Sequence, residues 1–289
     1  METKSAHFRR LLAGDEILIA PGAYDALSAK IIEQAGFSAI SATGAGISAS
    51  LGYPDVGLVT MSEVVARIKN MADATTVPLL ADADTGYGNA INVIRTVREF
   101  ESAGAAGIHI EDQVTPKKCG QLAGKELISV QEMVKKIEAA LEARRDPDFV
   151  IVARTDARSV YDLDEAIRRA NAFAGAGADA ILIYGAESKP ELRRIGREVR
   201  APLIGHISKG GKVRDIDAAQ MQEMGYRMVI FPLQAILAAA VSIAQLAREL
   251  RAGPSDRVFE GRMGLPAELY RIVGLQEVEE QERRFVTLA

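Results

Sequence analysis

Short apolar runs recur along the whole chain, and an amphipathic stretch separates most of them from the next. The runs do not alternate with polar residues, which is typical of strands in a buried parallel sheet. Residues 92–104, 129–145 and 163–177 repeat apolar positions at the helical period, and two of these stretches end in glycine, a common helix stop. We therefore expect eight strands, at residues 17–20, 38–43, 78–84, 106–112, 149–155, 179–184, 202–207 and 227–232.

Eight strands alternating with helices predict a fold of the α/β class, a (β/α)₈ barrel. A doubly wound open sheet is the alternative, but it usually has fewer strands, and the segment APGAYDALSA lacks its glycine fingerprint. A length of 289 residues is within the range of one barrel, so we expect residues 1–289 to form a single domain. Residues 254–289 follow the eighth strand, and we expect them to form a C-terminal helical extension of that domain, able to pack on a neighbouring subunit.

Composition and charge exclude several classes of partner. The formal net charge is −4 and the pI is near 5.6, whereas a nucleic-acid-binding protein needs a basic patch. No run of 18 or more apolar residues could span a membrane, and the first residues contain no apolar signal core. One cysteine cannot form an internal disulfide, which fits a reducing compartment. We expect a cytoplasmic protein that binds neither nucleic acid nor membrane.

Polar side chains end most of the expected strands. The carboxyl ends of barrel strands form the face where the chemistry of such barrels occurs, so these side chains should surround one pocket. They are Thr43 and Gly44, Asp82 and Asp84, His109, Glu111 and Asp112, Arg154 and Asp156, Tyr184, His206 and Ser208, with Asp55 further along the second connection.

The carboxylates in this ring point to a metal. Asp82 and Asp84 are two residues apart, as are His109 and Glu111, so each pair faces one side of its strand. Buried carboxylates repel one another and stay ionised together only beside a cation. Oxygen ligands favour Mg²⁺, with Mn²⁺ as the second choice, over Zn²⁺. The alternative is a set of ion pairs without a metal, to Arg154, Lys117 or Lys118.

Cys119 lies in the polar segment EDQVTPKKCGQLAGK, directly after the fourth expected strand. Its loop should hang over the same pocket, and the glycines in the loop let it move. We expect Lys117 and Lys118 to lower the cost of a thiolate. No Cys–His–Asn spacing supports a nucleophile, so a proton donor on a mobile lid is the simpler interpretation. An incidental surface thiol is the alternative.

Five motifs occur in order, PGAYDALSA, LGYPDVG, DADTGYGN, EDQVTPKKCG and ARTDA. Together they resemble the isocitrate lyase and phosphoenolpyruvate mutase superfamily over about residues 18–250. The Lys-Lys-Cys-Gly segment resembles the lid of the methylisocitrate lyase and dimethylmalate lyase branch, whereas the phosphonate branch has no cysteine there. The resemblance implies a barrel that binds Mg²⁺ and a 2-oxo acid or its enolate, and a homotetramer in which a C-terminal helix is swapped between subunits.

The resemblance also implies a role for each matching residue. Cys119 would donate a proton, Arg154 would neutralise an oxyanion, and Lys117 would hold a second carboxylate or bias the thiol. The metal would be held by Asp55, Asp82, Asp84 and Glu111, of which Glu111 is also a candidate catalytic residue. The substrate would be bound by Thr43, Gly44, Ala45, Gly120, Arg154, Tyr184, His206 and Ser208.

Four positions depart from methylisocitrate lyase. Gln121 replaces a histidine, Tyr184 a glutamate, His206 an asparagine and Leu237 an arginine. The last three positions would contact the far carboxylates of a tricarboxylate, so their change argues for a smaller substrate, such as a dialkylmalate.

The expected function is therefore a Mg²⁺-dependent carbon–carbon lyase. Its substrate would be a 2-hydroxy di- or tricarboxylate of the substituted malate or methylisocitrate type, and its products pyruvate or glyoxylate and a second carboxylic acid. One alternative is an oxaloacetate decarboxylase, or a mutase of the phosphonopyruvate or carboxyphosphonoenolpyruvate type. Another is a barrel that binds a 2-oxo acid without converting it.

Overall fold

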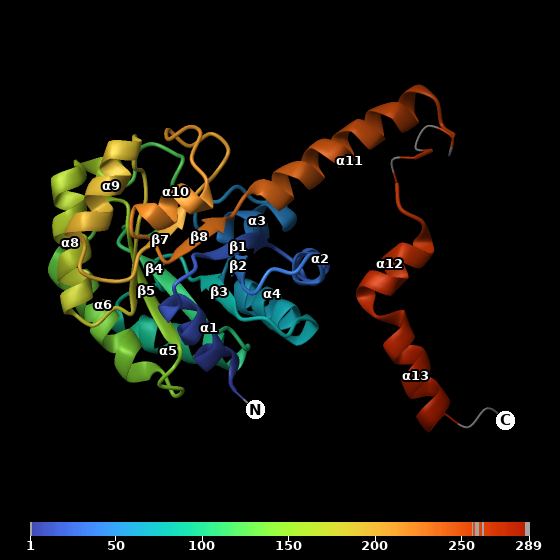
Figure 1. Ribbon diagram of the computed structural model, residues 1–289, viewed down its shortest axis with the longest axis horizontal. Coiled ribbons are helices and arrows are strands. Elements are labelled where there is room, and N and C mark those ends of the chain that lie inside the picture. The colour runs from blue at the N-terminus through green and yellow to red at the C-terminus, as the bar shows by residue number, and fades with distance from the viewer. Residues whose placement is uncertain (1, 256, 258–259, 262, 287–289) are drawn as a thin grey trace. The chain divides into compact units, whose positions relative to one another are not determined.

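The computed structural model describes residues 2–255, 257, 260–261 and 263–286, and its main feature is a sheet of eight parallel strands (Figure 1). All eight expected strands are present, shorter than expected by a residue or more at most ends. They are β1 (Leu18–Ala23), β2 (Ile40–Ala42), β3 (Leu79–Asp82), β4 (Gly107–Glu111), β5 (Val150–Thr155), β6 (Ala180–Ile183), β7 (Ile204–His206) and β8 (Met228–Phe231).

The sheet closes into a barrel. Strands β1 to β6 follow one another in sequence order, and β8 lies between β1 and β7. A parallel bridge between Ile181 and Leu203 joins β6 to β7, and the Ile181 N–H donates to the carbonyl of Pro202 at 2.9 Å. The (β/α)₈ prediction is confirmed, because every strand now has two neighbours.

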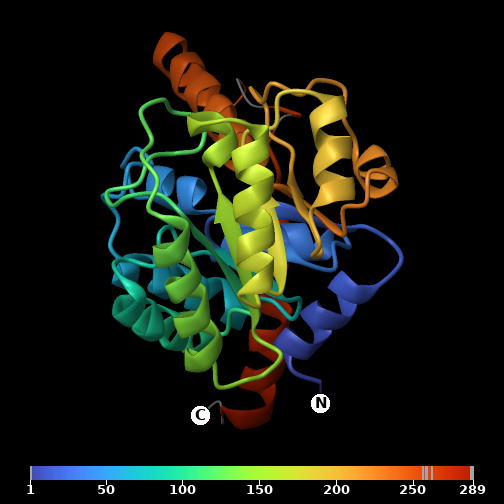
Figure 2. The same cartoon turned by 90° about the vertical axis from the view of Figure 1, so that its left-hand side faces the viewer.

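Helices cover the outside of the barrel, as the turned view shows (Figure 2). Most begin at a residue whose side chain accepts a hydrogen bond from the first turn, for example Asp25, Thr60 and Ser129. The helices between residues 1 and 233 are α1 (Lys4–Ala13), α2 (Ala26–Gln34), α3 (Gly44–Ser50), α4 (Met61–Ala74), α5 (Ala90–Ser102), α6 (Val130–Ala143), α7 (Ala157–Val160), α8 (Leu163–Gly175), α9 (Lys189–Glu198) and α10 (Ala218–Glu223).

The core has two parts. One fills the space between the strands and the surrounding helices, and the other fills the barrel. The inner part includes Leu80, Val152 and Met228 from the strands and Phe8 and Leu12 from α1. Aliphatic side chains therefore pack the interior, which leaves the strand ends for polar groups.

The chain divides into two compact units, Met1–Ile236 and Leu237–Ala289. Helix α11 (Gln234–Ala252) runs from the first into the second, which also contains α12 (Pro266–Val273) and α13 (Leu275–Phe285). The expected helical extension at 254–289 includes residues 256, 258–259, 262 and 287–289, which lie outside the described part. That residues 1–289 form one domain stays a prediction.

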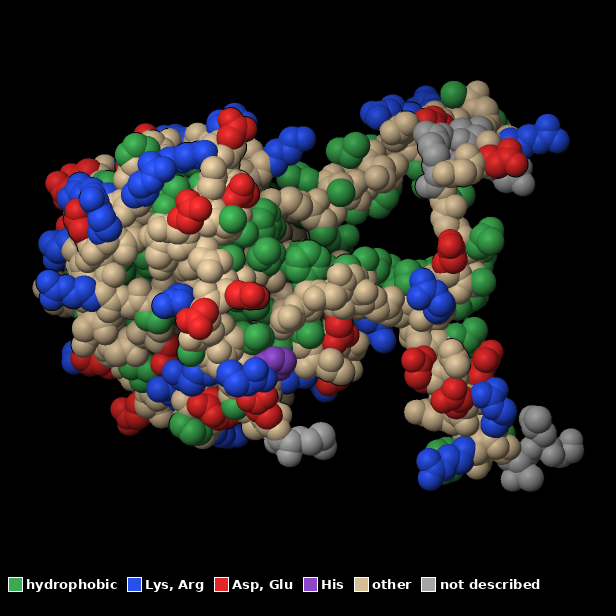
Figure 3. All heavy atoms as spheres, in the orientation of Figure 1, with side chains coloured by type: hydrophobic (Ala, Val, Ile, Leu, Met, Phe, Trp, Pro, Cys, Tyr) green, Lys and Arg blue, Asp and Glu red, His purple; other side chains and the backbone are tan. Residues whose placement is uncertain are grey.

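Apolar side chains stand exposed along the second unit (Figure 3). They include Val241 and Ile243 on α11 and Leu269 and Val273 on α12. Among the helices of the described residues, none combines the length and the apolar character needed to cross a bilayer.

Candidate active site

The strand register brings the expected site residues together at one end of the barrel. Asp82 on β3 lies opposite His109 on β4, and Glu111 on β4 lies opposite Arg154 on β5. These strand ends surround a small cavity of about 40 Å³. Of the expected substrate-binding and metal residues, the cavity is lined by Thr43, Ala45, Asp55, Asp82, Gly120, Arg154, Tyr184 and His206, and Cys119 also lines it.

Asp82 is at the centre of the polar floor. Its Oδ2 accepts the Gly44 N–H at 3.3 Å, and its Oδ1 accepts the Asp84 N–H at 3.1 Å. Burial alone would raise the pKa of Asp82, but His109, Lys117 and Arg154 lower it to about 2. A Cβ on Gly44 would meet Asp82 Oδ2 at 2.7 Å, so only glycine lets helix α3 approach this closely. Gly44 therefore supports Asp82 and does not line the cavity.

Lys117 lies behind the cavity wall and forms ion pairs with two carboxylates. Its Nζ contacts Asp55, and it lies 2.8 Å from Asp84 Oδ1. Burial lowers the pKa of Lys117, but the surrounding carboxylates, Asp84 first, raise it well above its usual value, so the side chain is cationic. Burial also raises the pKa of Asp84 to about 6. Lys117 and Asp84 thus lie in a layer beneath the cavity.

Arg154 is held in place by two acids. Its Nη1 lies 3.0 Å from Glu111 Oε2, and its Nε donates to Asp156 Oδ2 at 3.0 Å. Glu111 is fully buried, which raises its pKa well above the usual value, and neither of its oxygens accepts a hydrogen bond. Asp156 was expected only as a polar strand end, and it orients the guanidinium toward the cavity.

The carboxylates fit a divalent cation by charge and chemistry. Lys117 and Arg154 supply two positive charges against the four acids Asp55, Asp82, Asp84 and Glu111. The two oxygens of Glu111 are buried without hydrogen-bond donors, and a bound divalent cation would supply the partner that they lack. In the described part of the chain, however, no three His, Cys, Asp or Glu side chains converge in a metal-holding cluster. The ion pairs considered as the alternative to a metal, to Lys117 and Arg154, are both formed.

The loop after β4 covers the cavity and places Cys119 in its wall. The Cys119 N–H donates to the carbonyl of Asp55 at 2.9 Å, which joins this loop to the one after β2. Lys117 lowers the pKa of the Cys119 thiol, as expected, but burial raises it by more, so the net shift is upward. Lys118 turns away, and its Nζ donates to the Gly124 carbonyl at 2.6 Å. A protonated thiol is the form that a proton donor requires.

Two residues that sequence reasoning missed fix this loop. The Gln113 side chain donates to the Lys118 carbonyl and accepts the Lys118 N–H, each at 2.9 Å. Lys125 donates to the carbonyl of Leu122 at 3.0 Å and to that of Gly120. Both residues are buried although the segment reads as polar. The only signal in the sequence was that both lie close to Cys119 along the chain.

Tyr184 and His206 form one wall of the cavity. Their rings meet edge to face with centroids 4.9 Å apart, and the Arg154 guanidinium lies 4.9 Å from the centre of the Tyr184 ring. Burial raises the pKa of Tyr184 to about 12 and lowers that of His206 to about 3, so both are neutral at pH 7. Ser208 does not line this cavity but a second one behind the wall.

The sequence matches a family model. Residues 8–251 match the model described as phosphoenolpyruvate phosphomutase. The chain is 43% identical over 284 residues to 2,3-dimethylmalate lyase of Eubacterium barkeri, with 98% of each chain covered. It is 42% identical to 2-methylisocitrate lyase of Aeropyrum pernix, covering 98% of this chain and 91% of that one.

Solved structures give the same result. A crystal structure of 2,3-dimethylmalate lyase, a PEP mutase/isocitrate lyase superfamily member, superposes with a TM-score of 0.93 at 35% identity, covering 100% of this chain and 97% of that one. Oxaloacetate acetylhydrolase with 3,3-difluorooxalacetate has a TM-score of 0.93 at 34% identity, covering 99% and 98%. Phosphonopyruvate hydrolase with oxalate and Mg²⁺ has a TM-score of 0.89 at 31% identity, covering 99% and 100%.

These matches extend over the whole barrel and agree with the order of the motifs along the chain. The chain therefore belongs to the phosphoenolpyruvate phosphomutase family and is an enzyme of the PEP mutase/isocitrate lyase superfamily, at the level of carbon–carbon lyase chemistry, as its motifs predict.

Proposed function

We propose that the protein is a Mg²⁺-dependent lyase that cleaves a substituted malate into a 2-oxo acid and a second carboxylic acid. The observation that carries the proposal is the half-buried Cys119, whose thiol pKa is raised by burial, in the wall of a cavity floored by carboxylates and Arg154. Similarity to a dimethylmalate lyase and to methylisocitrate lyases supports the same reaction type. Because its one cysteine cannot form an internal disulfide, we place the enzyme in the cytoplasm.

Asp55, Asp82, Asp84 and Glu111 are the residues that would hold Mg²⁺, since their charge exceeds that of the two neighbouring cations. When bound, the ion lowers the pKa of the hydroxyl group on C2 of the substrate. The structure of phosphonopyruvate hydrolase with oxalate and Mg²⁺ supports this cofactor, and Mn²⁺ has the same ligand preference.

The chain's own residues position the substrate. Thr43 and Ala45 line the cavity at the start of α3, where the Thr43 hydroxyl and backbone N–H groups are suited to the C1 carboxylate. Arg154 faces the C2 oxygen as its charge develops, because Glu111 and Asp156 hold the guanidinium in one orientation. Lys117 forms ion pairs with Asp55 and Asp84 and holds both carboxylates in place, which differs from the expected contact with the second carboxylate.

Bond cleavage then needs one proton donor. The C2 hydroxyl proton passes to a carboxylate of the floor, the C2–O bond becomes a carbonyl, and the C2–C3 bond breaks. Its electron pair moves to C3 and into the adjacent C4 carboxylate. The Cys119 S–H donates its proton to C3, and the thiolate regains a proton from solvent. Such general acid catalysis contributes about 10²–10⁴-fold in rate.

The proposal is tested by proton NMR of the protein with a mixture of isocitrate, methylisocitrate, dimethylmalate, oxaloacetate and phosphonopyruvate. With Mg²⁺ present, we expect loss of dimethylmalate and appearance of pyruvate, and excess chelator should stop both. Loss of oxaloacetate or phosphonopyruvate alone would overturn the proposal in favour of the second candidate, an oxaloacetate-cleaving or phosphonate enzyme. Similarity to oxaloacetate acetylhydrolase, and neutral Tyr184 and His206 in the wall, are what favour that candidate.

A further inference from the structure

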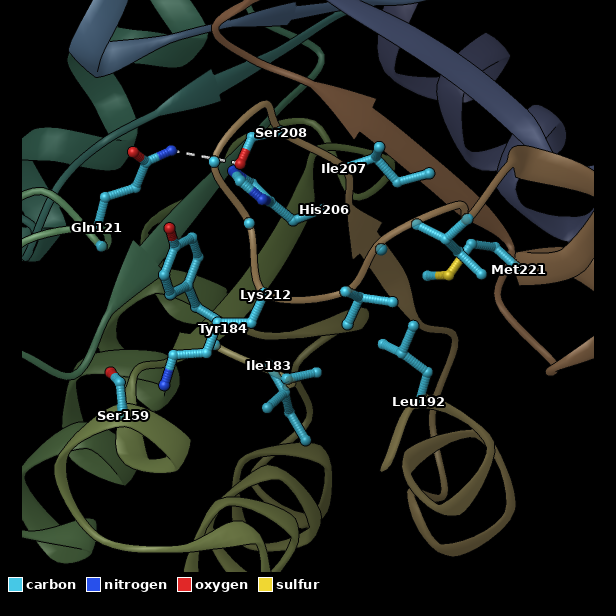
Figure 4. Close-up of a pocket in the computed structure, with 18 of the residues that line it drawn as sticks. Gln121, Ser159, Ile183, Tyr184, Leu192, His206, Ile207, Ser208, Lys212 and Met221 are labelled. Carbon is cyan, nitrogen blue, oxygen red and sulfur yellow. Dashed lines mark hydrogen bonds between the residues drawn. The ribbon is translucent and has the colours of Figure 1, made fainter. Parts of the chain in front are cut away.

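A second and larger cavity, of about 330 Å³, lies beside the candidate active site (Figure 4). It is lined by the ends of β6 and β7, by residues 207–216 and by the loop after β4 that carries Cys119, here called the lid loop. Its volume is in the range of about 300–1,000 Å³ that is usual for small-molecule sites. The catalytic cavity, at about 40 Å³, is much smaller.

The two cavities share one wall. Gly120, Gln121, Tyr184 and His206 line both of them. Gly120 lies flat against Tyr184, since a Cβ at this position would come within 2.5 Å of the ring. The two cavities are therefore adjacent, and a substituent on the carbon that Cys119 protonates would reach the larger one by displacing the contact between Gly120 and Tyr184.

The floor of the larger cavity is apolar and buried. Ile183, Leu192 and Met221 lie on the side away from Gln121, as the close-up shows. Met221 is 1% exposed, and Gly205 makes room for it, because a Cβ there would meet Met221 Cε at 2.3 Å. An apolar floor of this kind favours hydrocarbon over a charged group.

The charged residues that line this cavity already have partners. Lys212 forms an ion pair with Glu187, and Lys125 donates to the carbonyls of Gly120 and Leu122. Gln121 donates to Ser208 Oγ at 3.4 Å, at the polar edge. In the described lining, a third substrate carboxylate would thus find no unpaired cation, and its burial would be unfavourable.

We propose that the larger cavity binds an apolar substituent on C3 of the substrate, an alkyl chain longer than methyl. This inference rests on the proposed function, since it places the substituent on the carbon that Cys119 protonates. The substrate class is then a 3-alkyl-substituted malate, and the second product is a straight-chain monocarboxylic acid. The polar cavity holds the reacting atoms, and the apolar cavity selects the chain.

The test is isothermal titration calorimetry of the full-length protein with straight-chain monocarboxylates from propanoate to octanoate. Each methylene that enters the cavity should tighten binding about fourfold, until the cavity is full. An affinity that does not depend on chain length would overturn the inference.

Two variants make the test specific. Ala186→Phe fills part of the cavity and should weaken the binding of octanoate more than that of propanoate. The ratio of the two affinities should fall by about tenfold or more. Ile216→Ala enlarges the cavity and should move the best chain length upward. Ala66→Phe, an exposed position on α4, is the matched control and should leave the series unchanged. If neither cavity variant alters the series, the chains bind elsewhere and the inference is wrong.

The NMR assay separates this inference from the proposed function. If dimethylmalate is cleaved but the chain-length series is flat, the lyase stands and the apolar subsite does not. If the series rises, responds to both variants and no hydroxy acid is cleaved, the cavity binds alkyl chains but the proposed lyase is wrong.

Discussion

Cys119 is the residue on which the proposed chemistry depends most directly. In the Cys119→Ser variant, kcat for the lyase reaction should fall about 10²–10⁴-fold, because a hydroxyl is a far weaker acid than the thiol it replaces. KM should change little, since binding of the 2-oxo acid portion uses other residues. Steady-state kinetics with dimethylmalate measure both.

Lys118→Met is the matched control for this substitution, because Lys118 is adjacent but bonds to Gly124, away from the cavity. Its kcat should change by a few-fold at most. A Cys119→Ser enzyme with full lyase activity would contradict the proton-donor role. Unchanged activity on oxaloacetate alone would instead indicate the second candidate function.

His206 should make stability depend on pH. Burial, followed by the nearby Arg154 charge, lowers the pKa of His206 from 6.5 to about 3 in the folded protein. Between these values the unfolded chain binds a proton that the folded chain does not, so stability falls as the pH drops below about 6.5. The loss is at most about 1.4 kcal/mol per pH unit for one group.

Urea unfolding of the wild type and of His206→Gln between pH 7 and about 4.5 measures this contribution. The wild type should lose more stability than the variant over that interval. Parallel curves for the wild type and His206→Gln would show that His206 takes up its proton without unfolding.

At the scale of elements, the sequence predicted what periodicity can encode. The eight apolar runs form strands whose side chains are mostly buried on both faces of the sheet. Their polar ends lie together because all eight strands are parallel. Loop geometry could not be predicted in this way. Lys117 and Lys118 are adjacent, yet one pairs with Asp55 and Asp84 and the other turns outward to Gly124. Partners that are distant in sequence decide which lysine turns inward, and no local pattern records them.

The lid is anchored at its base more firmly than at its tip. Gln113 makes two hydrogen bonds to Lys118, each 2.9 Å and part-buried, whereas Gln121 contacts Ser208 and Lys209 at 3.4 Å in an exposed position. Gln113→Met keeps the volume and removes both bonds, at about 1 kcal/mol each. Opening of the loop should then become up to about 30-fold more frequent.

Hydrogen exchange of the amides between Lys117 and Gly124 measures this opening, and a fall in kcat should accompany it. Gln121→Ala is the comparison variant and should accelerate exchange by a few-fold at most. If Gln121→Ala loosens the loop more than Gln113→Met does, then the anchor lies at the tip and not at Gln113.

At the scale of the whole molecule, large apolar side chains are exposed on two helices of the second unit. Leu269 and Val273 on α12 are 47% and 46% exposed, and one helical turn separates them, so they lie on one face. Val241 and Ile243 on α11 are exposed by more than 60%. Exposed apolar helix faces mark protein interfaces, and the expected homotetramer is the assembly that we propose covers them.

Sedimentation equilibrium should therefore give a mass of four times the 31.0 kDa of one chain. Leu269→Glu would bury an unpaired charge in such an interface, so this variant should dissociate into smaller species at concentrations where the wild type is intact. Gln276→Glu adds the same charge at an exposed polar position on α13 and should not change the mass. A wild-type protein that sediments as a monomer would show that these apolar faces serve another purpose, and the catalytic cavity would then be complete within one chain.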